Sequence, residues 1–209
     1  MGLQYLTPEI MNREVLHIGV FAVIVLCWLA FGGIFLFRKK PPQTSERMRD
    51  RRSVVGIGLQ GLSYPFVWLI RRERFTSIMP LSPSIELALA VMTVALGVVS
   101  VWMIWSAVRA LGKQWSLAAR VVEDHKLVME GPYRFVRHPI YTGMLGLLLA
   151  TGLSLSYWSI LLLAVIVFGI GTAVRVHSEE KLLQGAFGSD WNAYVRRVPA
   201  ILPLWPRLR

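Results

Sequence analysis

Long apolar stretches separated by polar segments dominate the chain. They run from Leu16 to Phe37, from Ser53 to Ile70, from Ser84 to Val108 and from Pro139 to Val174. A bilayer needs about 20 apolar residues per helix, so the first and third stretches suffice for one span each and the second is marginal. The fourth is too long for one straight helix, and the turn-forming segment 152–157 divides it into a hairpin. The pattern predicts an all-α, polytopic membrane protein with about five transmembrane helices.

Composition agrees with this architecture. Hydrophobic residues make up 55% of the chain and charged residues 17%, and the mean hydropathy is +0.52, which is unusual for a soluble domain. The first stretch is too long for the apolar centre of a secretory signal, and basic residues follow it instead of a cleavage site, so we expect a retained helix. The single cysteine, Cys27, lies inside that stretch, so we expect neither a disulfide nor a cysteine-based metal site, and we assign no metal ligands.

The 23 Lys and Arg residues predict how the helices are oriented, because cytoplasmic loops of membrane proteins carry an excess of them. With five spans, four of these residues fall on one face and nineteen on the other. The basic face holds the first loop, the third loop and the carboxyl-terminal tail. We therefore expect the amino terminus outside and the tail in the cytosol, in the cell (inner) membrane in preference to an internal membrane.

A net charge of +11 also raises the possibility of nucleic-acid binding. The basic residues are distributed over loops that flank membrane spans, so orientation and contact with anionic lipid explain them better. Membrane lipids are therefore expected partners and nucleic acids are not. The first loop, with Pro41 and Pro42, reads as a solvated connector.

The third loop contains apolar residues that a plain linker would not need, among them Trp115, Val121 and Leu127, and so predicts a structured cytosolic cap. Pro139 suits the first turn of a helix, which places the start of the fourth helix near His138. The free amides and positive dipole end of that helix would suit a carboxylate or phosphate. Arg134, Arg137 and His138 crowd the same junction, where ionisable groups are costly near hydrocarbon; a bound polar ligand would explain them, and contact with lipid headgroups is the alternative.

A second polar group opens the tail, where Arg175, His177, Glu179 and Glu180 follow the last apolar run. If the helix continues, Arg175 and Glu179 share one face. An ordinary surface ion pair is the alternative reading. Because both polar groups lie at the cytosolic ends of consecutive hairpin helices, we expect the fold to bring them together.

The carboxyl-terminal half resembles the isoprenylcysteine carboxyl methyltransferase family, and related motifs occur in membrane phospholipid methyltransferases. The resemblance spans about residues 112–203. It rests on Asp124-His125-Lys126-Leu127-Val128, Gly131-Pro132-Tyr133, Arg137-His138-Pro139-Ile140-Tyr141-Thr142-Gly143, Arg175, Glu179-Glu180, Phe187-Gly188, Tyr194, Arg197-Val198-Pro199 and Pro203.

The resemblance implies an integral membrane enzyme that binds S-adenosylmethionine in a cytosolic pocket between the tail and the hairpin. It implies that Arg175 contacts the substrate. Arg120 stands where the family uses a glutamine. The implied cofactor-binding residues are His125, Lys126, Leu127, Val128, Tyr133, His138, Pro139, Ile140, Tyr141 and Glu179.

The methyl acceptor determines which further groups the reaction needs. Methyl transfer is an in-line displacement, so a carboxylate or thiolate acceptor needs no general base, and Arg175 could steer such an anion. For an amine or hydroxyl acceptor, His138 or Glu180 would be the candidate to take the proton. We expect a lipophilic or membrane-delivered acceptor, with the carboxylate or thiol of an isoprenylcysteine-like compound favoured.

Two domains and two alternative functions complete the interpretation. Residues 1–108 would form three transmembrane helices, and residues 109–209 the catalytic region, with the hairpin at 139–174 and an amphipathic helix in the tail around Trp191 and Tyr194. Membrane sterol reductases resemble this family in the carboxyl-terminal hairpin and tail but use a nicotinamide nucleotide, so an NADPH-dependent reductase is one alternative. A non-catalytic membrane interaction protein is the other.

Overall fold

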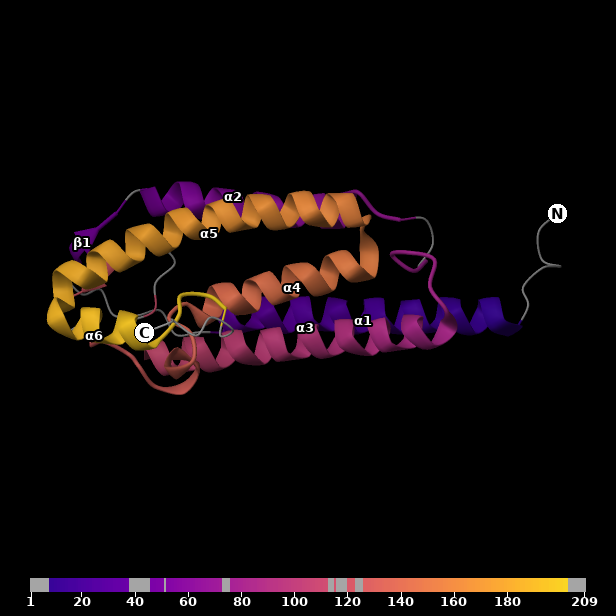
Figure 1. Ribbon diagram of the computed structural model, residues 1–209, viewed down its shortest axis with the longest axis horizontal. Helices are drawn as coiled ribbons and strands as arrows, with labels where there is room; N and C mark the ends of the chain where they lie inside the picture. The colour runs from indigo at the N-terminus through magenta and orange to yellow at the C-terminus, as the bar shows by residue number, and fades with distance from the viewer. Residues whose placement is uncertain are drawn as a thin grey trace.

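The structure is a computed structural model that describes residues 8–37, 46–50, 52–72, 76–112, 115, 120–122 and 126–202. Long helices make up most of it (Figure 1). In chain order they are α1 (Pro8–Leu36), α2 (Arg52–Leu69), α3 (Pro83–Leu111), α4 (Pro139–Leu155) and α5 (Trp158–Phe187), followed by a short α6 (Ser189–Arg197). The prediction of an all-α protein with five long helices is confirmed.

Successive helices run in opposite directions, so the chain passes back and forth along one axis (Figure 1). By length and composition, three are apolar and long enough to cross a membrane: Arg13–Leu36 within α1, all of α3 and all of α5. α4 is a shorter apolar helix. The protein is therefore a membrane protein, and crossing of the membrane by α2 and α4 stays a prediction. The back-and-forth course gathers the carboxyl ends of α1, α3 and α5 and the amino ends of α2 and α4 at one end, the site end.

The hairpin between α4 and α5 turns tightly at the opposite end, as predicted from residues 152–157. α4 ends at Leu155 and α5 begins at Trp158. Arg72, which follows α2, donates hydrogen bonds to the carbonyl oxygens of Leu153 and Ser154 at 2.9 Å each and also to that of Ser156. Because the last carbonyls of a helix have no partner within it, this guanidinium caps α4.

Two helix pairs, α2 with α5 and α3 with α4, form the most extensive contacts, and α1 packs on α3 and α4. α2 approaches α5 closely because Gly56 and Gly171 face each other. A Cβ atom at Gly171 would lie 2.8 Å from the Gln60 amide nitrogen and 2.9 Å from the Gly56 carbonyl oxygen. Val67, Leu148 and Phe168 then fill the space between α2, α4 and α5.

One sequence-based expectation is wrong. The first loop is not a plain solvated connector, because β1 (Glu46–Arg49) pairs with β2 (Arg120–Val122) in an antiparallel ladder with an irregularity near Met48. Such pairing joins segments about 70 residues apart and leaves no clear alternation signal in strands this short. The ladder ties the first loop to the third at the site end.

Candidate active site

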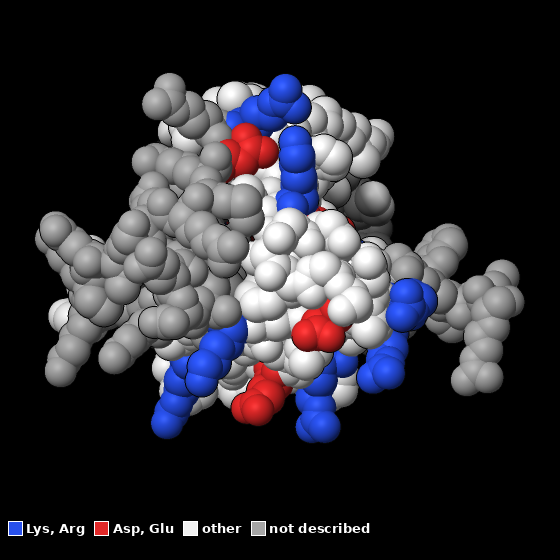
Figure 2. Space-filling model, turned by 90° about the vertical axis from the view of Figure 1, so that its left-hand side faces the viewer, with Lys and Arg blue, Asp and Glu red and all other residues white. Residues whose placement is uncertain are grey.

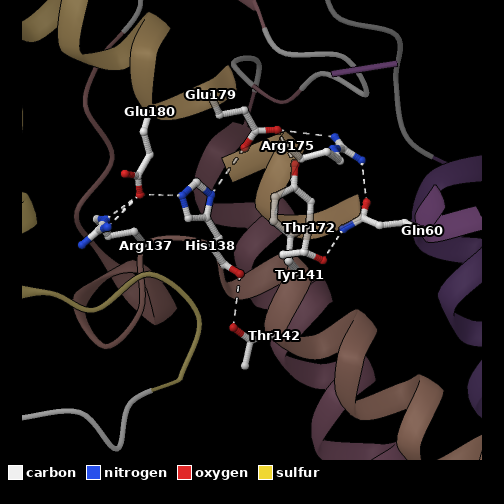
Figure 3. Close-up of polar contacts among 9 residues, drawn as sticks. All are labelled: Gln60, Arg137, His138, Tyr141, Thr142, Thr172, Arg175, Glu179 and Glu180. Atoms are coloured by element: carbon white, nitrogen blue, oxygen red, sulfur yellow. Dashed lines mark hydrogen bonds and ion pairs between the residues drawn. The ribbon is translucent and has the colours of Figure 1, made fainter. Parts of the chain in front are cut away.

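The two polar groups that the sequence singles out meet at the site end, as expected. His138 occupies the N-cap position of α4, and Pro139 is the first helical residue. Proline suits that position because it has no N–H that would need an intrahelical partner. α5 continues beyond its apolar part to Phe187 and carries Arg175, Glu179 and Glu180 along its last turns. Figure 3 shows these side chains facing one another.

His138 lies between the two carboxylates of α5. Its Nδ1 atom is 3.4 Å from Glu179 Oε2, and its Nε2 atom is 3.1 Å from Glu180 Oε1. An imidazole can donate from both nitrogens only when it is protonated. Burial alone lowers the pKa of His138, but the hydrogen bonds and charges of both carboxylates outweigh it, so the pKa of His138 is raised above its ordinary value of 6.5. The site therefore favours an imidazolium.

Arg137 and His138 lie on opposite sides of the Glu180 carboxylate (Figure 3). Arg137 links Glu180 to the segment that follows α6, here called the tail. Its Nε and Nη2 atoms are 2.9 and 2.7 Å from Glu180 Oε1. Its Nη1 donates to the Val198 carbonyl oxygen. Both partners of this ion pair are largely shielded from solvent, with side chains 5% and 25% exposed. The pair therefore holds together α5, the end of α6 and the two residues directly before α4, Arg137 and His138, which we call the α4 junction.

Arg175 lies on the other side, next to Glu179 and Tyr141. Its Nη2 atom is 3.5 Å from Glu179 Oε1, and its guanidinium carbon is 4.7 Å from the centre of the Tyr141 ring. The Tyr141 hydroxyl donates to Glu179. The predicted pairing of Arg175 with Glu179 is thus confirmed, and it is not an isolated surface pair, because Arg175 is only 6% exposed.

Two guanidiniums and one imidazole face two carboxylates in the described part of the site. Arg137 pairs with Glu180, Arg175 pairs with Glu179, and His138, whose pKa is raised, lies between the two carboxylates. Buried ions are costly unless they are paired, and an arginine suits a ligand carboxylate because its guanidinium can donate two parallel hydrogen bonds.

Backbone contacts join the junction to the tail. The amides of Arg137 and His138 donate to the carbonyl oxygens of Pro199 and Ala200 at 2.8 and 2.9 Å. The Thr142 hydroxyl is 2.7 Å from the Ile201 carbonyl oxygen. The expectation of free amides at the start of α4 is wrong for Tyr141 and Thr142, because both already donate to the His138 carbonyl oxygen. An anion must therefore be recognised here mainly by side chains.

Two of the remaining predicted cofactor residues, Tyr133 and Leu127, contact α6. Tyr133 is 7% exposed in the short 3₁₀ helix Gly131–Arg134, and its carbonyl oxygen accepts a 2.6 Å hydrogen bond from Tyr194. Burial raises the pKa of Tyr194 to about 12, which keeps its hydroxyl a donor. Leu127 packs against an α6 cluster of Trp191, Tyr194 and Val198, which confirms an amphipathic tail helix.

The other predicted residues differ in burial. Pro139 is fully buried, Ile140 and Val128 are half-buried, and Lys126 is exposed. His125 lies outside the described residues, as does the side chain of Arg120.

Three contributing residues were not assigned a role from the sequence: Gln60, Thr172 and Arg137. Gln60 on α2 accepts a hydrogen bond from Arg175 at 3.2 Å, and its amide nitrogen donates to Thr172 at 2.8 Å. The sequence places Arg137 in a polar group but does not predict its pairing with Glu180. The available signal for Gln60 was its position as a polar residue inside an apolar stretch, which membrane helices rarely tolerate without a function.

Known proteins resemble part of this chain. A family model described as phospholipid methyltransferase matches residues 86–190. The chain is 34% identical over 103 residues to the protein-S-isoprenylcysteine O-methyltransferase of Schizosaccharomyces pombe, a stretch covering 48% of this chain and 44% of that protein. It is 39% identical over 82 residues to the protein-S-isoprenylcysteine O-methyltransferase B of Arabidopsis thaliana, covering 39% of this chain and 41% of that protein.

The matched stretches thus span less than half the length of both relatives. The family match itself extends from near the start of α3 through the hairpin to the start of α6. It contains all of the residues labelled in Figure 3 except Gln60. Because it covers half of the chain, the chain belongs to the phospholipid methyltransferase family, as the resemblance in its motifs predicted.

Proposed function

We propose that this protein is an S-adenosylmethionine-dependent methyltransferase that methylates the carboxylate of a lipophilic, isoprenylcysteine-like acceptor. Family membership and the names of the two relatives support the reaction class. The observation that carries the choice of acceptor is the position of His138 between two carboxylates. The two carboxylates raise the pKa of His138 and so favour its protonated form, which cannot accept a proton; this supports an acceptor that is already an anion.

The residues at the site fit the methyl donor. S-adenosylmethionine has a sulfonium, an ammonium and an adenine with N–H groups, and the shielded Glu179 carboxylate suits a cationic or N–H partner. Tyr141 holds this carboxylate in place, because its hydroxyl donates to Glu179 while its ring lies between His138 and Arg175. Tyr133, Leu127 and Val128 would line the other side, together with His125, Lys126, Pro139 and Ile140 as the resemblance implies.

When bound, S-adenosylmethionine would supply a methyl group to the acceptor oxygen, and its sulfur would leave in line with the C–S electron pair as the neutral thioether of S-adenosylhomocysteine. Arg175 steers the acceptor carboxylate, because its guanidinium can donate two parallel hydrogen bonds to one. Glu180 and Arg137 fix His138 from the side away from Glu179. The protein thus contributes mainly position and exclusion of water, with no proton to move.

We also propose that the site end lies in the cytosol and the hairpin turn on the outer side of the cell membrane. Exposed basic residues of the described segments at this end support the orientation, and Figure 2 shows basic side chains around its rim. They include Lys126, Arg134, Lys181, Arg196 and Arg197.

The experiment is a transfer assay with the purified protein in detergent or lipid nanodiscs. S-adenosylmethionine labelled in its methyl group is incubated with N-acetyl-S-farnesylcysteine as the acceptor. A methyl ester releases labelled methanol in base, whereas a thioether or methylated amine does not. We expect base-labile label that requires both the protein and the acceptor carboxylate.

Other outcomes would redirect the assignment. Base-stable label on a thiol or amine acceptor would keep the methyltransferase and reject the carboxylate. Thermal stabilisation by NADPH, with none by S-adenosylmethionine or S-adenosylhomocysteine, would favour a reductase. Stabilisation by none of these would favour a non-catalytic interaction protein.

A further inference from the structure

A hydrogen-bonded chain connects the site to α2, a helix that lies outside the family match. Resting on the function proposed above, we propose that Gln60 is a positioning residue that holds Arg175 toward the reacting groups and thereby gives the enzyme its preference for an anionic acceptor. The chain runs from Thr172 to Gln60, then to Arg175, and ends at Glu179 and Tyr141 (Figure 3).

The contacts of Gln60 define which way its amide points. Its Oε1 atom accepts from Arg175 Nη1 at 3.2 Å, and its Nε2 atom donates to Thr172 Oγ1 at 2.8 Å. A flipped amide would place an NH₂ group against the guanidinium, donor against donor. Arg175, which can only donate, therefore sets the orientation of the Gln60 amide, and Thr172 accepts from the NH₂ group in that orientation.

The backbone around Gln60 is fixed as well. Gln60 is 1% exposed, and α2 contacts α5 at Gly56 and Gly171, where no larger residue fits without displacing backbone or the Arg175 stem. A rigid scaffold of this kind determines side-chain position more closely than a loop would. Gln60 and Glu179 contact different terminal nitrogens of Arg175, Nη1 and Nη2.

The neutrality of Gln60 matters for selectivity. A carboxylate at this position would pair with Arg175 and compete with an acceptor anion. An amide oxygen holds the guanidinium by hydrogen bonding and leaves its charge in place. The chain therefore orients Arg175 without neutralising its guanidinium, which favours an anionic acceptor.

The test compares Gln60→Leu, which removes the acceptor atom, and Gln60→Glu, which adds a competing charge. Gln184→Leu, at an exposed position on α5, is the matched control. The readouts are kcat and KM for N-acetyl-S-farnesylcysteine, the inhibition constant of its neutral carboxamide, and the dissociation constant of S-adenosylhomocysteine. Thermal stability in detergent is measured alongside.

We expect Gln60→Leu to raise KM for the carboxylate about tenfold, the effect of losing one hydrogen bond to a charged group. The inhibition constant of the carboxamide and the dissociation constant of S-adenosylhomocysteine should change less than about twofold. The ratio of the carboxamide's inhibition constant to the KM of the carboxylate should therefore fall by a factor of about ten. Gln60→Glu should raise KM further. Gln184→Leu should match the wild type.

Several results would overturn the inference while leaving the methyltransferase in place. One is an active wild type whose KM is unchanged in both Gln60 variants. Another is an equal loss of acid, amide and S-adenosylhomocysteine binding, which would show a merely structural role. If instead the wild type itself transfers no methyl group to the acceptor, the proposed function is wrong, and the inference about Gln60, which rests on it, is wrong as well.

Discussion

At the scale of single residues, two adjacent glutamates do different work because of helical geometry. Successive residues on an α-helix point about 100° apart, so Glu179 turns toward Arg175 and Tyr141 while Glu180 turns toward Arg137. His138 lies in the angle between them. One dipeptide thereby serves both the ligand side and the tail side of the site.

This difference predicts that the two amide substitutions separate ligand binding from stability. Glu179→Gln should weaken S-adenosylmethionine binding at least about tenfold, because a charged hydrogen-bond partner is lost. Glu180→Gln should instead lower the unfolding temperature by roughly 5 °C, because Arg137 loses its carboxylate. Isothermal calorimetry and thermal unfolding in detergent measure the two effects. Equal effects of both variants on ligand binding would contradict the division.

The imidazolium of His138 predicts a pH-dependent stability. A pKa raised in the folded protein means that the stabilisation is fully present below the unfolded value of about 6.5 and is lost as pH rises through the folded value. His138→Gln cannot titrate. The difference in unfolding temperature between wild type and His138→Gln should therefore shrink as pH is raised from 6 toward 9 in a series of buffered thermal scans. A constant difference would argue against the charged form.

At the scale of helices, close contact between α2 and α5 connects packing to chemistry. The same glycines that let the helices touch also set the distance from Gln60 to Arg175. A change in helix spacing should therefore alter the site without altering any of its side chains.

Gly171→Ala tests this connection, with Gly169→Ala on the same helix as its control. An added Cβ at Gly171 would meet backbone of α2 at 2.8 and 2.9 Å, whereas a Cβ at Gly169 would have no neighbour within 4 Å. Overpacking of this kind costs about 1–3 kcal/mol. We expect Gly171→Ala to lower both the unfolding temperature and kcat/KM, and Gly169→Ala to leave both near the wild type. Tolerance of alanine at both positions would contradict the packing argument.

The Arg72 cap predicts an effect at the opposite end of the hairpin. Arg72→Met removes a guanidinium that donates to the last carbonyls of α4, so the unfolding temperature should fall by roughly 5 °C. Transfer kinetics measured well below that temperature should stay unchanged, because the site lies at the other end of α4. Arg71→Met, whose side chain is exposed, is the control. A change in KM for the acceptor would show that the two ends are coupled.

At the scale of the whole molecule, the features that could be predicted were those with a local or additive signal. Apolar length located the helices, and Pro139 marked the start of α4. The meeting of His138 with Glu179 followed from the hairpin, since antiparallel neighbours must bring those ends together. Charge counting then supplied an orientation.

The rest required contacts between distant segments. Gln60 lies 115 residues from Arg175, and helix pairing over such a distance is not encoded in the periodicity of either helix. The tail binds the α4 junction through carbonyl oxygens, which every residue possesses and which leave no mark in the sequence. The short β1–β2 ladder was missed for the same reason.

The orientation of the molecule predicts labelling on opposite sides of the membrane. In a Cys27→Ser background, Met79→Cys places a thiol at the end away from the site, and Ser189→Cys places one at the start of α6; both positions are exposed. An impermeant maleimide should label the first in intact cells and the second only after permeabilisation. The reverse pattern would place the site outside the cell.

The bonds from the amides of Arg137 and His138 to the carbonyls of Pro199 and Ala200 bear on how the protein is made. All five long helices precede these carbonyls in the chain, so Arg137 and His138 lack these acceptors until residues 199 and 200 have left the ribosome. Synthesis of the helices and closure of the site are therefore separate events in time. A chain released before Pro199 would keep all five long helices but could not form these two hydrogen bonds.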